Sequence, residues 1–118
     1  MSNRRFCFAC DLKDNPQLIE EYKHYHKSDV IWPEIIDTLA DAGITHMHIF
    51  LTGNRLFMIM DVDASFDIEQ KTAKDTANPK VQEWETLMWK YQQAVPWAAE
   101  GEKWILMEDI FNFKRIES

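Results

Sequence analysis

The amino-acid sequence predicts an α+β protein in which a four-stranded antiparallel sheet carries helices on one face. The predicted elements follow the order strand, helix, strand, strand, helix, strand, which is the split β-α-β arrangement, and a proline interrupts each helical part. The tight turn signal Thr52-Gly53-Asn54-Arg55 joins the two middle strands as a hairpin. The length of 118 residues, 46% of them apolar, suits one domain with a packed core over residues 1–118.

The first predicted pair is a strand over residues 5–12 and a helix over residues 17–26. The strand is rich in aromatic and small apolar residues, and the helix contains no glycine or proline after Pro16, which suits a first helical turn. Cys7 and Cys10 lie in the strand, so their thiols face opposite sides. This placement favours two free, buried cysteines over a redox or metal motif.

A second helix should begin at Pro33, because the residue before a proline is pushed out of the helical region. Gly43 suits the position after its last turn, near Ala42. The remaining predicted elements are strands over residues 45–51 and 56–62, helices over 68–76 and 80–94, a loop over 96–103 and a last strand over 104–111.

Composition and charge restrict the partners. The formal net charge of −7 argues against nucleic acid and anionic membranes and favours a neutral or cationic ligand. No apolar run approaches the roughly 20 residues of a membrane span. The polar start over residues 1–5 is not followed by the apolar segment of a signal peptide, so we expect a cytoplasmic protein. A sheet covered on one face also predicts a symmetric homodimer that packs sheet on sheet or exchanges edge contacts.

The strongest chemical candidates are Tyr22 and His26. They are four residues apart, so they share one helix face, whereas His24 points away. An imidazole moves protons near neutral pH, and a phenol donates or accepts a hydrogen bond. From spacing alone, an ordinary half-buried pair is the more common outcome for two such residues.

Two further groups of side chains have spacings typical of binding sites. His46 and His48 share a strand face, which is the geometry of a two-histidine metal pair, but no third ligand is implied nearby. We therefore expect no metal site. Trp84 and Trp89 lie five residues apart on one predicted helix and either stack on a neutral ligand such as a sugar or belong to the core.

The chain resembles the L-rhamnose mutarotase family in a combined pattern of motifs. The motifs are Glu20-Glu21-Tyr22, His26 and Ile31-Trp32-Pro33-Glu34, together with Gly43 and the tryptophan-bearing helix before Val95-Pro96. The resemblance implies a ferredoxin-like fold that assembles as a dimeric α/β barrel and interconverts the anomers of a 6-deoxy-L-sugar without a cofactor. It also places His26 on the family's proton-donor position and Tyr22 on a sugar-contact position.

The departures from the family pattern concern the sugar-contacting positions. Family members that act on rhamnose tend to have a tyrosine where Met47 stands and a Trp-Trp pair where this chain has Trp84-Glu85, with Trp89 a turn further on. We therefore expect Met47, Trp84 and Trp89 to contact the sugar, and we favour L-fucose slightly over L-rhamnose. The second proton-transfer group is left open between Tyr22, Asp11 and a water. The alternative function is a non-catalytic, small-ligand-binding dimer of the same fold.

Overall fold

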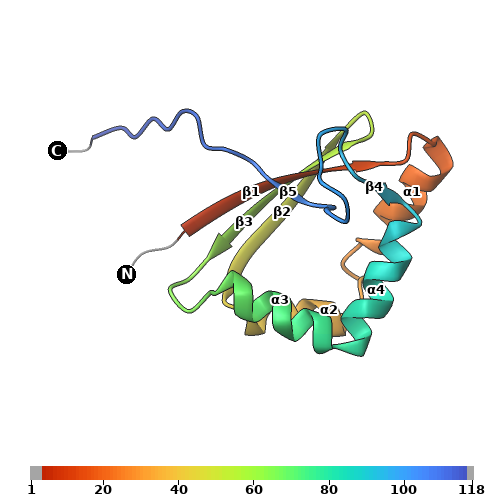
Figure 1. Cartoon of the computed structure of the whole chain (residues 1–118), viewed down its shortest axis with the longest axis horizontal. Coiled ribbons are helices and arrows are strands. Elements are labelled where there is room, and N and C mark those ends of the chain that lie inside the picture. The colour runs from red at the N-terminus through yellow and green to blue at the C-terminus, as the bar shows by residue number, and fades with distance from the viewer. Residues whose placement is uncertain (1–3, 117–118) are drawn as a thin grey trace.

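The computed structural model describes residues 4–116, and its centre is one antiparallel sheet (Figure 1). The long strands run in the order β2-β3-β1, and two short segments, β4 and β5, both pair with the outer edge of β1. The strands are β1 (Arg4–Leu12), β2 (Ile44–Thr52), β3 (Arg55–Val62), β4 (Gln92–Gln93) and β5 (Ile105–Leu106). This order confirms the predicted split β-α-β arrangement, with β3 in a central position.

The helices of the described chain all lie on one face of this sheet (Figure 1). They are α1 (Pro16–Tyr25), α2 (Pro33–Asp41), α3 (Ile68–Ala77) and α4 (Pro79–Trp89). Asn15, Asp67 and Asn78 precede α1, α3 and α4, and each side-chain oxygen accepts two backbone N–H groups of the first helical turn. These caps satisfy donors that would otherwise have no intrahelical partner, and they explain why the helices begin where they do.

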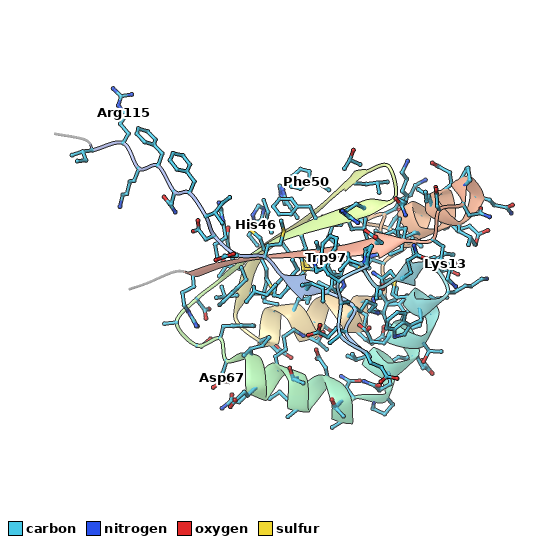
Figure 2. The ribbon with its side chains drawn as sticks, turned by 45° about the horizontal axis from the view of Figure 1, so that its top comes forward. Lys13, His46, Phe50, Asp67, Trp97 and Arg115 are labelled. Atoms are coloured by element: carbon cyan, nitrogen blue, oxygen red, sulfur yellow. The ribbon has the colours of Figure 1, made fainter. Side chains whose placement is uncertain are left out.

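Alternation along the strands divides the sheet into two chemically different faces. The pairs Phe8↔Met58 and Ile49↔Met58 lie on the face under the helices, and the side chains there are mostly apolar, with Arg4 over the Phe6 ring at the start of β1. The opposite face carries Arg5, Cys7, His46, His48, Phe50, Phe57, Ile59 and Asp61. Figure 2 shows His46 and Phe50 on this second face, away from the helices.

The main core forms where α1 and α4 pack against the sheet. Leu12, Leu56 and Tyr91 are each 1% exposed, and burying a side chain of the Leu class stabilises the fold by about 1.5–3 kcal/mol. The buried members of this cluster are Cys10, Leu12, Tyr22, Ile35, Leu56, Val81, Trp84, Met88 and Tyr91. Cys7 and Cys10 are both free and lie on opposite faces of β1, as predicted. Only Cys10 is buried, so the prediction that both are buried is wrong for Cys7, which lies on the uncovered face of the sheet.

Two predicted boundaries are wrong, and both errors concern the edge of β1. The helix predicted over residues 80–94 ends at Trp89, because Gln92 and Gln93 pair with Leu12 and Asp11 instead of extending the helix. The strand predicted over residues 104–111 is reduced to Ile105–Leu106. The unpaired backbone groups of β1 thus receive two short partners, and pairing with them outweighs local helix propensity.

Beyond β5 the chain leaves the domain. The backbone N–H of Met107 still donates to the Cys7 carbonyl oxygen at 2.7 Å. Residues 108–116 then run as an arm away from the sheet, and Figure 2 shows Arg115 near its far end. The arm exposes large apolar side chains, namely Ile110, Phe111, Phe113 and Ile116. Within residues 4–116 none of the helices has the length and apolar character needed to cross a membrane.

Candidate active site

A cavity of about 710 Å³ lies between the apolar face of the sheet and the helices. This volume is within the roughly 300–1,000 Å³ that is usual for small-molecule sites. Its walls are mostly apolar, with Met47, Ile49 and Met58 on the sheet side and Ile35 and Leu39 on α2. The chemistry predicted for the end of α1 therefore lies under the sheet, in the interior between the two layers.

Tyr22 and His26 meet on this wall, as their spacing predicts. The centroids of the two rings are 4.3 Å apart. Tyr22 lies in the last turns of α1 and is 4% exposed, and His26 is the residue that caps the C-terminal end of the helix. His24 is exposed and lies on a separate, polar depression beside Tyr25 and Lys90.

The hydrogen bonding of His26 determines which ring nitrogen is reactive. Its Nδ1 lies 2.8 Å from the backbone carbonyl oxygen of Tyr22. A carbonyl oxygen can only accept, so Nδ1 carries a hydrogen and the neutral ring keeps its lone pair on Nε2. Burial lowers the pKa of His26 below its usual 6.5, against the smaller opposing effect of that backbone hydrogen bond. The neutral form of His26 is therefore favoured, and Nε2 is the ring nitrogen that can accept a proton.

The hydroxyl of Tyr22 is held from the other side by Gln92. The amide Nε2 of Gln92 donates to the Tyr22 hydroxyl oxygen at 3.1 Å. Burial raises the pKa of Tyr22 well above its usual 10, so the phenol keeps its proton and serves as a hydrogen-bond donor. Gln92 itself is 3% exposed and lies on the cavity wall.

Trp84 belongs to the core and also borders the cavity. It is 7% exposed. Its ring meets His26 edge to face at a centroid distance of 5.5 Å and Trp32 at 5.1 Å. These contacts fix the rings around the reactive nitrogen by packing.

The other two predicted sugar contacts lie in different places. Met47 is in β2 and lies on the cavity wall that the sheet forms, facing the helices across the cavity. Trp89 is 41% exposed and does not line the cavity; its ring lies 4.8 Å from the ammonium group of Lys103. The structure thus brings Tyr22, His26, Met47 and Trp84 together around one space and leaves Trp89 outside it.

A charged pair at the same cavity was not predicted. Lys103 and Glu85 both line the cavity and form a close ion pair, and the Lys103 side chain is 9% exposed. Lys103 comes from the loop before β5, next to Trp104, which also lines the cavity. The pair therefore ties this loop to α4 and closes one side of the space.

Asp11 does not reach the cavity. It lies between Cys10 and Leu12, which face the core, so its side chain is on the opposite face of β1. There it forms a two-pronged ion pair with Arg55, at 2.7 Å and 3.1 Å. Of the three candidates for the second proton-transfer group, Asp11 is therefore excluded by its position, and Tyr22 and a water are left.

The two strand histidines share a face, as predicted, but it is the uncovered face of the sheet. The His46 and His48 rings are 4.3 Å apart, and His46 Nδ1 lies 4.0 Å from Asp61. Across the described part of the chain no three His, Cys, Asp or Glu residues are grouped to hold a metal ion. Asp61 forms an ion pair with Arg5, in which Nε of Arg5 lies 2.7 Å from Oδ1 of Asp61. The hydrogen bond from Arg5 lowers the pKa of the Asp61 carboxyl group.

The site residues that the sequence did not indicate, Gln92, Lys103 and Trp104, lie in segments with weak local signals. Gln92 belongs to a run without glycine or proline that reads as the end of a helix, and the other two follow an irregular loop. One signal was available for Gln92. A polar residue between the apolar Tyr91 and Val95 on a segment that enters the core requires a polar partner there.

Comparison with known proteins gives a consistent result. The sequence profile of the family described as L-rhamnose mutarotase matches residues 5–113. The L-fucose mutarotase of Xanthomonas campestris pv. campestris is 43% identical over 104 residues, which are 88% of this chain and 83% of that protein. An L-rhamnose mutarotase of Burkholderia ambifaria is 36% identical over 63 residues, 52% of this chain and 59% of that protein.

Solved structures agree with these sequence matches. The crystal structure of an L-rhamnose mutarotase from Formosa agariphila superposes with a TM-score of 0.68 at 25% identity, and the match covers 94% of this chain and 99% of that chain. The tetracenomycin F2 cyclase of Streptomyces glaucescens has a TM-score of 0.61 at 13% identity, covering 96% and 99%. The second likeness concerns the fold alone.

Proposed function

Since the chain belongs to the L-rhamnose mutarotase family and is a sugar-anomer isomerase, we propose that it interconverts the α and β anomers of a 6-deoxy-L-hexose by acid/base ring opening. We favour L-fucose over L-rhamnose as the sugar. The observation that carries the proposal is the neutral His26, whose Nε2 lone pair is free while Nδ1–H is held by the Tyr22 carbonyl at the wall of a cavity large enough for a sugar.

The chemistry needs two proton movements and no electron transfer. A base takes the proton of the anomeric hydroxyl while the bond between the anomeric carbon and the ring oxygen breaks and the ring oxygen gains a proton. This step gives the open-chain aldehyde. Rotation about one bond and closure on the other face of the carbonyl reverse both transfers and form the other anomer. Protons and electrons balance, so the reaction requires neither a metal nor an organic cofactor.

His26 is assigned the first of these proton transfers. Its neutral Nε2 accepts the anomeric proton on opening, and the resulting imidazolium returns a proton on closing, so the same residue acts as proton donor in the reverse direction. The other proton passes through Tyr22 or a water, since Asp11 is bound by Arg55 on the opposite face of β1. A positioned acid or base typically contributes about 10²- to 10⁴-fold.

The preference for L-fucose rests on Met47 and on one relative. Met47 supplies a thioether where rhamnose-acting family members tend to have a tyrosine, so a directional hydrogen bond is replaced by an apolar contact. The relative at 43% identity is named an L-fucose mutarotase. Trp84 supplies an aromatic wall for the C–H face of the sugar. Trp89 lies outside the cavity and is not assigned a direct contact.

We further propose that the protein works as a homodimer. The uncovered sheet face presents Phe50, which is 50% exposed and stacked on Phe57 at a centroid distance of 6.2 Å. The arm over residues 108–116 projects away from the sheet (Figure 2), and its Ile110, Phe111, Phe113 and Ile116 side chains are exposed. Both are surfaces that a second copy covers in a two-fold assembly. A location in the cytoplasm stays a prediction.

Magnetisation-transfer NMR on the sugar tests the function directly. In such an experiment one anomeric proton is saturated, and the transfer to the other anomer gives the exchange rate. The wild-type protein should accelerate this exchange for L-fucose more than for L-rhamnose at equal enzyme concentration. His26→Gln should lose about 10²-fold or more of the acceleration, because a glutamine amide cannot carry a proton. His24→Gln, one helical face away, should retain it.

Three results would contradict the proposal. Exchange in the His26→Gln protein at the wild-type rate would remove His26 from the chemistry. A clear preference for L-rhamnose would return the chain to the substrate that gives the family its name. Ring exchange unchanged by the wild-type protein for both sugars would contradict the proposed substrate class altogether.

A further inference from the structure

Gln92 is a buried polar residue with an incomplete set of hydrogen bonds. It lies in β4, opposite Leu12 of β1, and is 3% exposed. Its amide Nε2 donates to the Tyr22 hydroxyl at 3.1 Å. Its Oε1 is buried and, within the described residues, has no hydrogen-bond partner. Buried amide groups in folded proteins are almost always satisfied, so an unsatisfied one needs a reason.

Exchanging Oε1 and Nε2 by rotating the side-chain amide of Gln92 does not supply the missing hydrogen bond. The Tyr22 hydroxyl can either donate or accept, so it can pair with Oε1 or with Nε2 of Gln92, and the other amide atom is then left without a partner. A purely apolar residue at this position would avoid the deficit. The position therefore retains a polar group that the packing of the core does not require.

The contact with Tyr22 explains what this polar group does. In this arrangement the Nε2 of Gln92 donates a hydrogen bond, and the hydroxyl oxygen of Tyr22 accepts it. The O–H hydrogen of Tyr22 is therefore left to donate to another group. The Tyr22 ring lies against the His26 ring, with centroids 4.3 Å apart, and both residues line the cavity. The O–H that is left to donate thus belongs to a side chain that packs against His26 at the cavity wall.

We propose that Gln92 is a positioning residue for ring opening, which acts through Tyr22 by holding its hydroxyl so that the O–H points to an oxygen of the bound sugar. This inference rests on the proposed function of the site. Gln92 does not exchange protons with the sugar. It fixes the donor direction of Tyr22, and the Tyr22 O–H stabilises negative charge that develops on a sugar oxygen as the ring opens.

A double-mutant cycle tests the coupling of the two residues. The proteins are wild type, Gln92→Met, Tyr22→Phe and the double variant, and each is measured for kcat and KM of anomer exchange and for its unfolding midpoint. Methionine keeps the length of the glutamine side chain and removes both polar atoms. Gln93→Met is the matched control, because Gln93 is the exposed neighbour in the same two-residue strand.

We expect kcat of Gln92→Met to fall by about tenfold, which corresponds to the loss of one well-placed hydrogen bond, while KM changes little. In the Tyr22→Phe background the same substitution should have almost no further effect, because the hydroxyl on which it acts is gone. The double variant should unfold at a midpoint equal to or above that of wild type, since both members of the polar pair are replaced by apolar groups. Gln93→Met should behave as wild type.

Each other outcome overturns the inference. Wild-type kcat in Gln92→Met shows that the amide is not needed. A tenfold loss that persists undiminished in the Tyr22→Phe background shows that Gln92 acts without Tyr22. A fall in kcat that is matched by a large fall in the unfolding midpoint of the double variant assigns Gln92 a structural role. Failure of the proposed function is recognised separately, because the wild-type protein then accelerates no sugar.

Discussion

At the scale of single residues, burial controls how His26 titrates. The pKa of the folded state lies below the usual 6.5 because the protein interior disfavours the imidazolium. Catalysis that uses the neutral Nε2 should therefore stay constant as the pH falls through 6.5 and decline only at a lower pH. Anomer-exchange rates measured from pH 8 to pH 4, with the uncatalysed rate subtracted, check this. A decline centred at or above pH 6.5 would contradict it.

The same shift has a consequence for stability. The unfolded chain takes up the proton first as the pH falls, because its histidine has the higher pKa. The contribution of His26 is therefore fully present above the unfolded pKa of about 6.5 and is lost as the pH falls towards the folded pKa. His26→Gln should reduce the loss of unfolding free energy between pH 7 and pH 5, as measured by urea titration.

Met47 is the residue at which the sugar preference is most directly tested. Met47→Tyr restores the hydroxyl that rhamnose-acting relatives tend to have on this part of the cavity wall. It should raise the exchange rate of L-rhamnose relative to L-fucose by about tenfold, the equivalent of one directional hydrogen bond. Met47→Leu is the control, since it keeps an apolar side chain of similar volume. An unchanged ratio in Met47→Tyr would remove Met47 from the determinants of specificity.

At the scale of elements, the connection between α2 and β2 depends on Gly43. Its φ is +91°, and a Cβ built there would lie 2.6 Å from both the Asp63 and Ser65 side chains. Gly43→Ala should therefore lower the unfolding free energy by more than about 1 kcal/mol. Gly53→Ala is the matched comparison, because the hairpin glycine also has a positive φ, +56°, but has nothing within 4 Å. Equal losses for the two variants would contradict the steric explanation.

The loop that precedes β5 is also an element with a function in the site. Lys103 reaches Glu85 of α4 and lies over the ring of Trp89, while its neighbour Trp104 lines the cavity. Trp89 is thus part of the packing that holds the loop. The tryptophan that lines the cavity is Trp84, whose replacement by alanine would also open the core.

At the scale of the whole molecule, the exposed arm bears on assembly. Ile110, Phe111, Phe113 and Ile116 are 86%, 83%, 76% and 90% exposed in the single chain, which is unfavourable for so many large apolar side chains. A variant that ends at Met107 should shift the protein from dimer to monomer in light scattering coupled to size exclusion. Phe50→Ser changes the uncovered sheet face. It should weaken the dimer if the two copies pack sheet on sheet, and leave it intact if they exchange only their arms. A wild-type protein that is monomeric would contradict the proposed dimer.

The sequence by itself determined what depends on neighbours along the chain. The contact between Tyr22 and His26 follows from four-residue spacing on a helix, and the hairpin between β2 and β3 follows from its turn residues. The starts of α1, α3 and α4 follow from their caps and prolines. These features have short-range causes, so they can be derived from local pattern.

Tertiary structure alone decided which distant segments meet. Gln92 reaches Tyr22, 70 positions away, because residues 92–93 pair with the free edge of β1 instead of completing α4. The same edge ends β5 early and brings Lys103 to the cavity, while Asp11 is turned to the opposite face. The energy of satisfying an unpaired strand edge and of filling a core is shared among many residues. This energy cannot be derived from any short stretch of sequence, and it can exceed the local preference for helix.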